Sequence, residues 1–383
     1  MKLQQIKISK KDSKILDLSK LIQLQPQLIL VFGSKSMLAD GEIYRQLIHQ
    51  LPGVWLAGCS TAGEITNDGV HDDTLTLTGL HFEQVTVRVA STEVQNLEGS
   101  RGAGREIGHI LQGEDLKGVC VFGPGIQING SEIIAGMVEK LGADIPISGG
   151  LAGDSGAFVE TVTVTPEGVS PRGLVAFGLY GSGVDIGYGS FGGWLPFGPA
   201  RKVTRCQGNI LFELDGGPAL AIYRNYLGDY SKDLPASGLL FPFEMLNSDQ
   251  SNAGLIRTIL GIDDQVGSLT LAGDINPDGY LRLMHANIDG LVDGAEAAAH
   301  AVLERITGEQ TGLSILVSCV GRKLVMGDNI DEEVDAVLDV LGKENMVTGF
   351  YSYGEISPQA SNGECKLHNQ TMTILWIGEK SVP

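Results

Sequence analysis

The chain has 383 residues, of which 43% are hydrophobic and 19% charged, and this composition excludes a disordered protein. Its formal net charge of −19 argues against nucleic-acid and anionic-membrane partners, because both would repel it. No apolar run approaches the ~20 residues of a membrane span, and the N-terminus lacks the apolar core of a secretory signal. We therefore expect a cytoplasmic globular protein of two or three domains, with no membrane or nucleic-acid partner.

The first 27 residues are charged and polar and predict a lead-in helix. Residues 28–32 predict a buried strand, and the spacing of Ile43, Leu47 and Ile48 predicts one face of a helix. A second apolar run, residues 54–57, ends in a loop of small residues, 58–65, that is closed by a carboxylate. Loops of this kind at strand ends are where α/β folds place their sites.

This loop recurs along the chain. A shift of ninety residues maps Ala62-Gly63-Glu64 onto Ala152-Gly153-Asp154, and residues 349–356 form a looser third copy. Each copy ends a unit made of a strand, an amphipathic helix and a second strand, with a further strand later. The pattern predicts an α/β (α+β) fold with internally repeated strand-helix-strand units in two mixed-sheet domains.

The region between the second and third units is less regular. Residues 187–198 are rich in glycine and aromatics, which is typical of pocket walls and equally of packed bends in sheets. Residues 203–214 predict a hairpin and 219–227 a helix. The composition becomes more polar from about Gly228, so we expect a lead-in at 1–27 and domains at 28–225 and 226–383.

Enzymatic interpretations of the first loop each fail on a specific residue. The run from Gly58 to Ala62 resembles a nucleophile elbow around Ser60, but alanine replaces the last glycine and no helix follows immediately. Cys59 has no histidine linked to it in the sequence, and no P-loop or dinucleotide-binding motif occurs. We expect no enzymatic activity, with a nucleophile at Cys59 or Ser60 as the alternative.

A non-catalytic pocket fits these residues better. Glu64, Asp154 and Glu355 occupy matching positions and suit an amine, while Arg322 after a strand of the third unit suits a carboxylate. An amino acid carries both groups. The competing interpretation is that the acids cap neighbouring turns and the glycines are steric necessities. The predicted ligand-binding residues are Cys59, Ser60, Thr61, Glu64, Gly150, Asp154, Trp194, Arg322, Tyr353 and Glu355.

Six stretches together resemble the FIST domain proteins: residues 58–64, 149–154, 193–198, 213–219, 318–322 and 349–355. The resemblance implies that 28–225 is an N-terminal FIST sensory domain and 226–383 a C-terminal FIST domain. It also implies a sensor of small molecules, for which amino acids have been proposed. Some stand-alone members look like haem-binding nitric-oxide sensors that regulate a partner histidine kinase, and this chain resembles the stand-alone type.

Haem is the alternative ligand. The seven histidines form no i, i+4 pair, and His368 before the last predicted strand is the candidate axial ligand. Aromatics and prolines between residues 188 and 199 would supply an apolar slot. Arg201, Lys202 and Arg205 would supply cations for the propionates. The sequence does not decide between haem and a smaller ligand.

Overall fold

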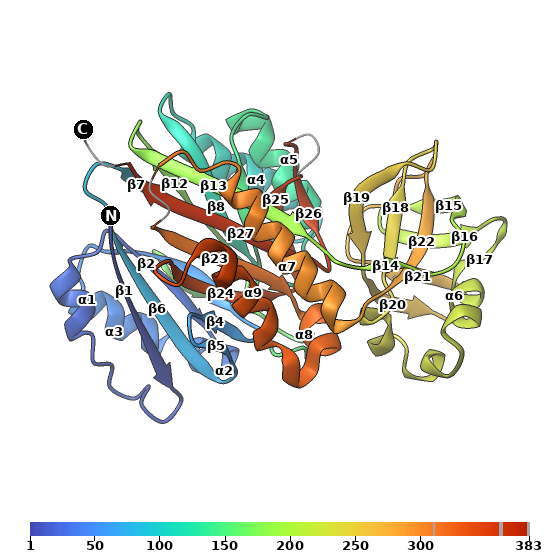
Figure 1. Cartoon of the computed structure of the whole chain (residues 1–383), viewed down its shortest axis with the longest axis horizontal. Helices are drawn as coiled ribbons and strands as arrows, with labels where there is room; N and C mark the ends of the chain where they lie inside the picture. Colours follow the sequence, from blue (N-terminus) through green and yellow to red (C-terminus); the bar gives the residue numbers. More distant parts are fainter. Residues whose placement is uncertain (309–310, 360–362, 381–383) are drawn as a thin grey trace.

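Three mixed sheets of six strands each form the larger part of the protein, here called the three-sheet core (Figure 1). The computed structural model describes residues 1–308, 311–359 and 363–380. The first sheet has the order β1 (Lys2–Ser9), β6 (Thr74–His81), β2 (Leu28–Gly33), β3 (Trp55–Ser60), β10 (Thr163–Thr165) and β11 (Gly168–Ser170). The second has β26 (Cys365–His368), β25 (Gly354–Pro358), β9 (Ile147–Leu151), β8 (Leu116–Gly123), β12 (Gly173–Tyr180) and β7 (Thr86–Glu93). The third has β13 (Val184–Phe191), β27 (Met372–Glu379), β23 (Leu313–Cys319), β24 (Met346–Ser352), β4 (Glu64–Thr66) and β5 (Gly69–His71).

Each sheet is built on one parallel pair of strands joined through a helix. The pairs are β2 with β3, β8 with β9 and β23 with β24. An antiparallel strand flanks the first member of each pair: β6, β12 and β27 respectively. The predicted mixed α/β fold class and its three repeated units are confirmed. The helices of the core are α1 (Ser19–Leu24), α2 (Lys35–Leu38), α3 (Glu42–Gln50), α4 (Ser100–Leu111), α5 (Gly130–Leu141), α7 (Ile288–Leu303), α8 (Val320–Met326) and α9 (Asp331–Leu341).

The hairpin that follows each Gly-acid loop joins the sheet of another unit. Hairpin β4–β5 of the first unit pairs with β24 of the third, and β10–β11 of the second pairs with β3 of the first. Hairpin β25–β26 of the third unit completes the second sheet on β9. Every sheet therefore needs a strand from a different unit, and the three units interlock.

One glycine in each unit is required where the paired strands cross closely. A Cβ on Gly58 would lie 1.9 Å from the carbonyl oxygen of Val31, its partner in register. The equivalent distances are 2.0 Å for Gly149 and 1.9 Å for Gly349. Real Cβ atoms do not approach backbone oxygens this closely, so these three positions accept only glycine.

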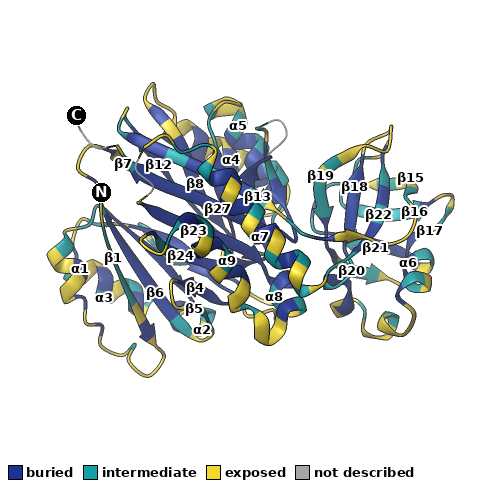
Figure 2. Cartoon of the chain, in the orientation of Figure 1, coloured by how far each residue is buried: buried dark blue, intermediate teal, exposed yellow. Residues whose placement is uncertain are grey.

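An apolar centre lies between the three sheets, as the dark blue strands of Figure 2 show. The ring centroid of Phe32 lies 5.3 Å from that of Phe122 and 4.8 Å from that of Phe350. All three rings are fully buried. Burial of such rings, at roughly 25 cal/mol per Å² of apolar surface, is the main force that holds the sheets together.

The predicted lead-in helix is wrong over residues 2–9, which form strand β1. This strand pairs antiparallel with β6 along its whole length, from Lys2 opposite His81 to Ser9 opposite Thr74. Ile8 is buried in the cluster beneath this sheet, and Ile6 packs against the same cluster. The two isoleucines alternate with polar residues, which is the period of a half-buried strand, and the open edge of β6 supplies the partner. The only helix before residue 28 in the described chain is the short α1.

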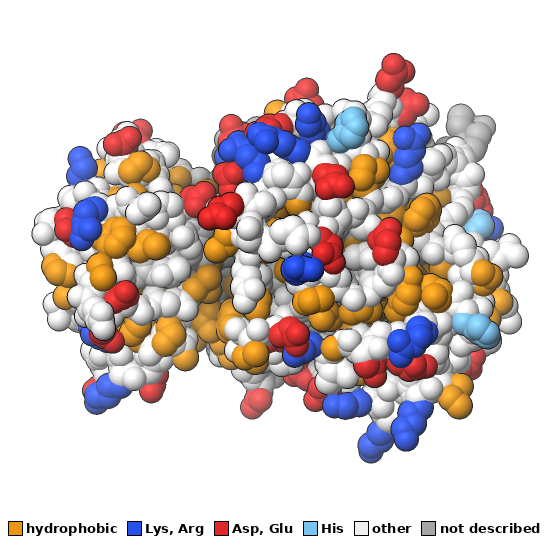
Figure 3. Space-filling model, turned by 180° about the vertical axis from the view of Figure 1, so that it is seen from behind, with side chains coloured by type: hydrophobic (Ala, Val, Ile, Leu, Met, Phe, Trp, Pro, Cys, Tyr) orange, Lys and Arg blue, Asp and Glu red, His pale blue; other side chains and the backbone are white. Residues whose placement is uncertain are grey.

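The chain leaves the three-sheet core after β13 and returns at α7, and residues 195–285 between them form an outer lobe (Figure 1). In Figure 3 the outline of the molecule is narrower where this lobe meets the core than across either part. Its nine strands are antiparallel, and its helix α6 (Ala219–Leu227) lies where the sequence predicts one. The strands are β14 (Leu195–Pro196), β15 (Arg201–Gln207), β16 (Ile210–Leu214), β17 (Gly217–Pro218), β18 (Phe243–Leu246), β19 (Asn252–Arg257), β20 (Ile259–Asp263), β21 (Ser268–Leu271) and β22 (Tyr280–His285).

Among the described residues, no helix has both the length and the apolar composition that crossing a membrane requires.

Candidate functional site

The three Gly-acid loops meet and bond to one another at what we call the loop junction, residues 60–64, 151–154 and 351–355. The Gly153 N–H donates to the Ser60 carbonyl at 2.8 Å, which joins the second loop to the first. The Ala62 N–H donates to the Tyr351 carbonyl at 2.8 Å, which joins the first to the third. The Tyr353 N–H donates to the carbonyl of Leu151 at 3.2 Å and closes the ring of contacts.

The space between these loops is taken up by their own atoms. A Cβ on Gly153 would lie 2.7 Å from the Ala62 nitrogen. The Ser60 hydroxyl donates to the Gly153 carbonyl at 2.7 Å and accepts from the Val162 N–H at 3.0 Å. Cys59 is fully buried, and burial raises the pKa of its thiol well above the usual value. The predicted residues of the first loop are thus brought together inside packed protein.

Glu64 bonds within its own unit. Its carboxyl group accepts from the hydroxyl of Thr61, three residues earlier, and from the Thr74 N–H and hydroxyl at 3.1 and 2.6 Å. Burial raises the pKa of Glu64 to about 7, against the opposing effect of these hydrogen bonds.

Glu355 repeats this arrangement in the third unit. It accepts from the Ser352 hydroxyl at 2.7 Å, again three residues earlier, and from the Thr371 N–H and hydroxyl at 3.2 and 3.1 Å. Burial raises the pKa of Glu355 to about 8, so this side chain is largely uncharged at neutral pH.

Asp154 closes the turn that follows it. It accepts from the N–H groups of Phe158, Val159 and Glu160 at 2.8 to 2.9 Å, and from the Tyr353 hydroxyl. Burial raises the pKa of Asp154, but these hydrogen bonds outweigh that effect and hold the pKa below its usual value. All three acids therefore have protein partners, as the turn-capping interpretation expects.

Arg322 contacts a carboxylate, but that carboxylate belongs to Glu333 of the protein itself. Its Nε and Nη2 both donate to Glu333 Oε2, at 2.9 and 2.6 Å, and neither side chain is exposed. Nη1 and the second N–H of Nη2 reach the carbonyls of Gly192 and Leu291 at 2.5 and 2.8 Å. To hold a ligand carboxylate through two hydrogen bonds, this guanidinium would have to give up at least one of these bonds.

A cavity of about 290 Å³ lies where the outer lobe meets the core, and we call it the seam cavity. Strands β18, β19 and β22 of the lobe line one side, and the other side is lined by residues 190–194 at the end of β13, by Gln359, and by His368 of β26 with the turn after it. The residues that define it chemically are Trp194, Glu244, Ile256, Gln359, His368 and Thr371. Glu355 lies directly behind it, because it bonds to Thr371.

The polar groups of the seam cavity are held in place by their neighbours. Glu244 is 5% exposed, pairs with Arg282 at 2.5 Å and accepts from Asn252 at 2.7 Å. The Trp194 indole donates to the Gln370 carbonyl at 2.8 Å. Burial lowers the pKa of His368 to about 4, so its imidazole is neutral at pH 7. Of the residues of this cavity, the sequence analysis predicted Trp194 as ligand-binding and His368 as the candidate haem ligand.

Sequence reasoning missed two residues of this cavity. Glu244 and Gln359 are single polar residues with no repeated counterpart, so no motif marked them. Only the approach of the lobe to β26 brings them together.

Among the described residues, a small number of side-chain hydrogen bonds join the lobe to this part of the core, and one of them runs from Gln370 Nε2 to the Thr258 hydroxyl at 3.0 Å. Gln359 Nε2 donates to the Ala253 carbonyl at 3.0 Å, and Gln370 Nε2 donates to the Leu239 carbonyl at 3.0 Å. Arg257 Nη1 donates to the Leu367 carbonyl at 3.2 Å. A molecule bound in the seam cavity would contact both sides of this joint.

The seam cavity does not fit haem well. The His368 Nε2 already lies 3.0 Å from the Ser357 carbonyl. Arg201 and Arg205, predicted to hold the propionates, pair with Asp215 and Glu213 inside the lobe. Within the described ranges, no group of three or more His, Cys, Asp or Glu side chains is placed to hold a metal ion.

The chain matches two adjacent sequence families over most of its length. The FIST N domain matches residues 27–217 and the FIST C domain residues 219–358, so the protein belongs to the FIST family. FIST domains are generally small-ligand sensors associated with signalling. The two regions do not coincide with the core and the lobe, since each contributes strands to both. The predicted boundary at 225/226 falls inside α6.

Two individual proteins are also similar. An uncharacterized protein of Methanocaldococcus jannaschii is 34% identical over 100 residues, 25% of this chain and 19% of that protein. This chain therefore matches only about a fifth of that relative's length. A crystal structure of cyanuric acid hydrolase from A. caulinodans aligns over 99% of both chains at 10% identity, with a TM-score of 0.36. At that TM-score the likeness carries no weight for function.

Proposed function

We propose that the protein is a cytoplasmic small-molecule sensor whose ligand occupies the seam cavity. The observation that carries this proposal is a cavity lined by both the lobe and the core, next to a joint of few hydrogen bonds. Ligand sites form preferentially at such boundaries between structural units. A ligand that contacts both sides favours one relative position of lobe and core, and that difference is a signal a partner protein can detect.

The cavity favours a small ligand with an amine, of which amino acids are the simplest class. The buried carboxylate of Glu244 suits an ammonium group, and the Trp194 ring suits an apolar side chain. Its volume of about 290 Å³ lies at the lower end of the range of ~300–1,000 Å³ that is usual for ligand pockets.

We propose that this role is non-catalytic. The Cys59 thiol and the Ser60 hydroxyl are fully buried, and the raised pKa of Cys59 disfavours the reactive thiolate. The signal would pass to a partner protein such as a histidine kinase. This part of the proposal rests on the resemblance to stand-alone family members. The charge of −19 disfavours nucleic acid as the partner.

Thermal and chemical unfolding with each of the twenty standard amino acids tests the proposal. A ligand at a hundredfold excess over its Kd should stabilise the wild-type chain by about 2.7 kcal/mol. The Glu244→Gln and Gln359→Ala variants should lose most of that response. Gln112→Ala, on an exposed position of the core, should keep it. Stabilisation that persists in both cavity variants would place the site elsewhere, and no response to any amino acid would exclude this ligand class.

Haem is the second candidate on the family resemblance; the neutral imidazole of His368 lines the cavity, but its Nε2 would have to give up the Ser357 carbonyl to bind iron. Titration with haemin and an absorption spectrum decide it. An intense Soret band that moves with nitric oxide and disappears in His368→Gln would support haem. Protein that takes up none would leave the amine ligand as the better account.

A further inference from the structure

A second cavity, of about 520 Å³, lies beside β26 and is separate from the seam cavity. Helix α5 and β26 of the core line it together with Arg257 of the lobe. Successive side chains of a strand point to opposite faces, and Ile256 lines the seam cavity while Arg257 lines this one. We call it the Arg257 cavity.

Arg257 is a buried cation that forms no ion pair with any described residue, although the charge of the Asp274 carboxylate acts on it from nearby. Its side chain is 4% exposed. Nε donates to the Asp274 carbonyl at 3.1 Å, and Nη1 donates to the carbonyls of Ile256 and Leu367 at 3.2 Å. These bonds use Nε and Nη1 and leave Nη2 without an acceptor among the described residues. Burying an unpaired charge is costly, and burial lowers the pKa of Arg257 to about 10.

The other charges of this cavity lie at its rim and neutralise one another. Arg101 pairs with Glu132 and Glu139 at 3.3 and 2.8 Å, Arg105 pairs with Glu139 at 2.5 Å, and Lys366 pairs with Glu364 at 3.0 Å. All six side chains are at least 35% exposed, so water screens them. The deeper wall is apolar, with Ile134 and Val138 of α5 and Leu367 of β26. The cavity therefore combines a buried guanidinium, which has no ion-pair partner among the described residues, with an apolar surface.

We infer that the Arg257 cavity binds a small organic carboxylate whose apolar body packs against α5. The carboxylate would accept from the free Nη2 of Arg257 and would bring a directly bonded negative charge to it, in addition to the more distant charge of Asp274. The ligand would touch α5 and β26 on one side and the lobe on the other. This inference does not rest on the ligand proposed for the seam cavity, because the two cavities share no lining residue.

Calorimetric titration with hexanoate, and with 1-hexanol as the uncharged analogue of equal length, tests the inference. Hexanoate should bind the wild-type chain at one site, at least tenfold more tightly than hexanol. Arg257→Met keeps the length of the side chain without its charge and should reduce hexanoate binding to the level of hexanol. Arg45→Met, which removes an exposed arginine paired with Glu42, should bind hexanoate like the wild type.

A second measurement uses the wild-type chain, so it tests the inference even if the Arg257→Met variant does not fold. Cys365 lines the same cavity and is 8% exposed, so hexanoate should slow its alkylation by iodoacetamide at least threefold, whereas hexanol at equal concentration should not. The Cys365→Ser variant identifies the labelled site. Equal binding of hexanoate and hexanol, no binding of either, or unchanged binding in Arg257→Met would overturn the inference.

Discussion

The loop junction and the seam cavity differ in both sequence and packing. The loop junction is the most repeated part of the chain, and its glycines, hydroxyls and acids bond to one another. The seam cavity is hollow, and the residues that define it have no repeated counterpart apart from Thr371, which corresponds to Thr74. Repetition in this protein therefore marks the places where three units must interlock, whereas the seam cavity lies where the repeat is interrupted by the lobe.

The largest loss of stability is expected from breaking the buried ion pair between Arg322 and Glu333 in the third unit. Arg322→Met leaves the Glu333 carboxylate buried with only the hydroxyls of Ser318 and Tyr351. We expect the free energy of unfolding to fall by about 3–5 kcal/mol in denaturant titration. Arg172→Met, which removes an exposed pair with Glu93, is the control and should change it by about 0.5 kcal/mol or less. A small loss in Arg322→Met, with an amino-acid response retained, would show that the junction does not depend on this pair.

The close crossing of strands gives the next prediction. Gly58→Ala places a Cβ 1.9 Å from the Val31 carbonyl, and we expect a loss of about 3 kcal/mol in the free energy of unfolding. Gly102→Ala is the matched control, because it lies in α4 with open space around the new methyl group. It should stabilise the protein by about 0.5–1 kcal/mol. Equal tolerance of both changes would contradict the steric account of the repeat.

The raised pKa of Glu355 predicts a pH dependence of stability. The folded protein holds this proton up to about pH 8, whereas the unfolded chain releases it near the usual 4.5. The folded state thus binds more protons between these values, so this contribution is full below pH 4.5 and is lost as the pH rises towards 8. Relative to Glu355→Gln, the wild type should lose about 3 kcal/mol between pH 5 and 8. Glu42→Gln, at an exposed ion pair, should follow the wild type, and parallel curves for all three proteins would contradict the shift.

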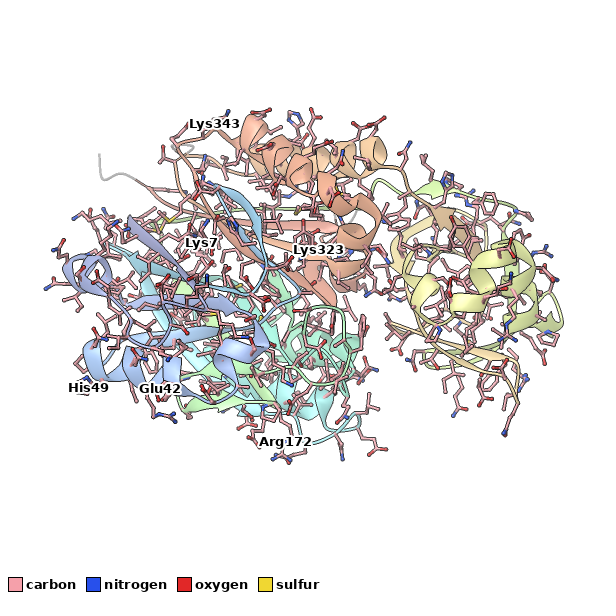
Figure 4. All side chains as sticks on the ribbon, turned by 90° about the horizontal axis from the view of Figure 1, so that it is seen from below. Lys7, Glu42, His49, Arg172, Lys323 and Lys343 are labelled. Carbon is pink, nitrogen blue, oxygen red and sulfur yellow. The ribbon has the colours of Figure 1, made fainter. Side chains whose placement is uncertain are left out.

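The smallest effect concerns Lys323, which Figure 4 shows where the third unit faces the first. Its ammonium group donates to the Ala62 carbonyl at 2.9 Å and to the Asp72 carboxylate at 2.5 Å. Lys323→Met should cost about 1 kcal/mol in unfolding free energy. Lys343→Met, at an exposed residue 3.9 Å from Asp339, should cost nothing measurable. Equal stability of the two variants would show that this contact does not tie the units together.

Much of the fold was predictable from the sequence because each unit carries its own local signals. Apolar runs marked β2, β8 and β23, and the Gly-acid pattern located the three loops. Helix α6 was predicted to the residue, since Pro218 precedes it and Gly228 follows it. Hydrophobic period and turn residues act over a few positions, so they are visible without any tertiary information.

Only the tertiary structure decided where the hairpins pair and where the cavities lie. Hairpins β4–β5, β10–β11 and β25–β26 each pair with a sheet edge of another unit. The three units offer similar edges, and no local sequence pattern tells which edge a hairpin will join. From the sequence, the Glu64 carboxylate could equally bind a ligand or cap a turn. Only the structure shows that Thr61 and Thr74 lie beside it and donate hydrogen bonds to it. Glu244 and Gln359 face one cavity because two parts of the chain more than a hundred residues apart pack together. Contacts of that range depend on the whole packed chain, and a sequence read locally does not contain them.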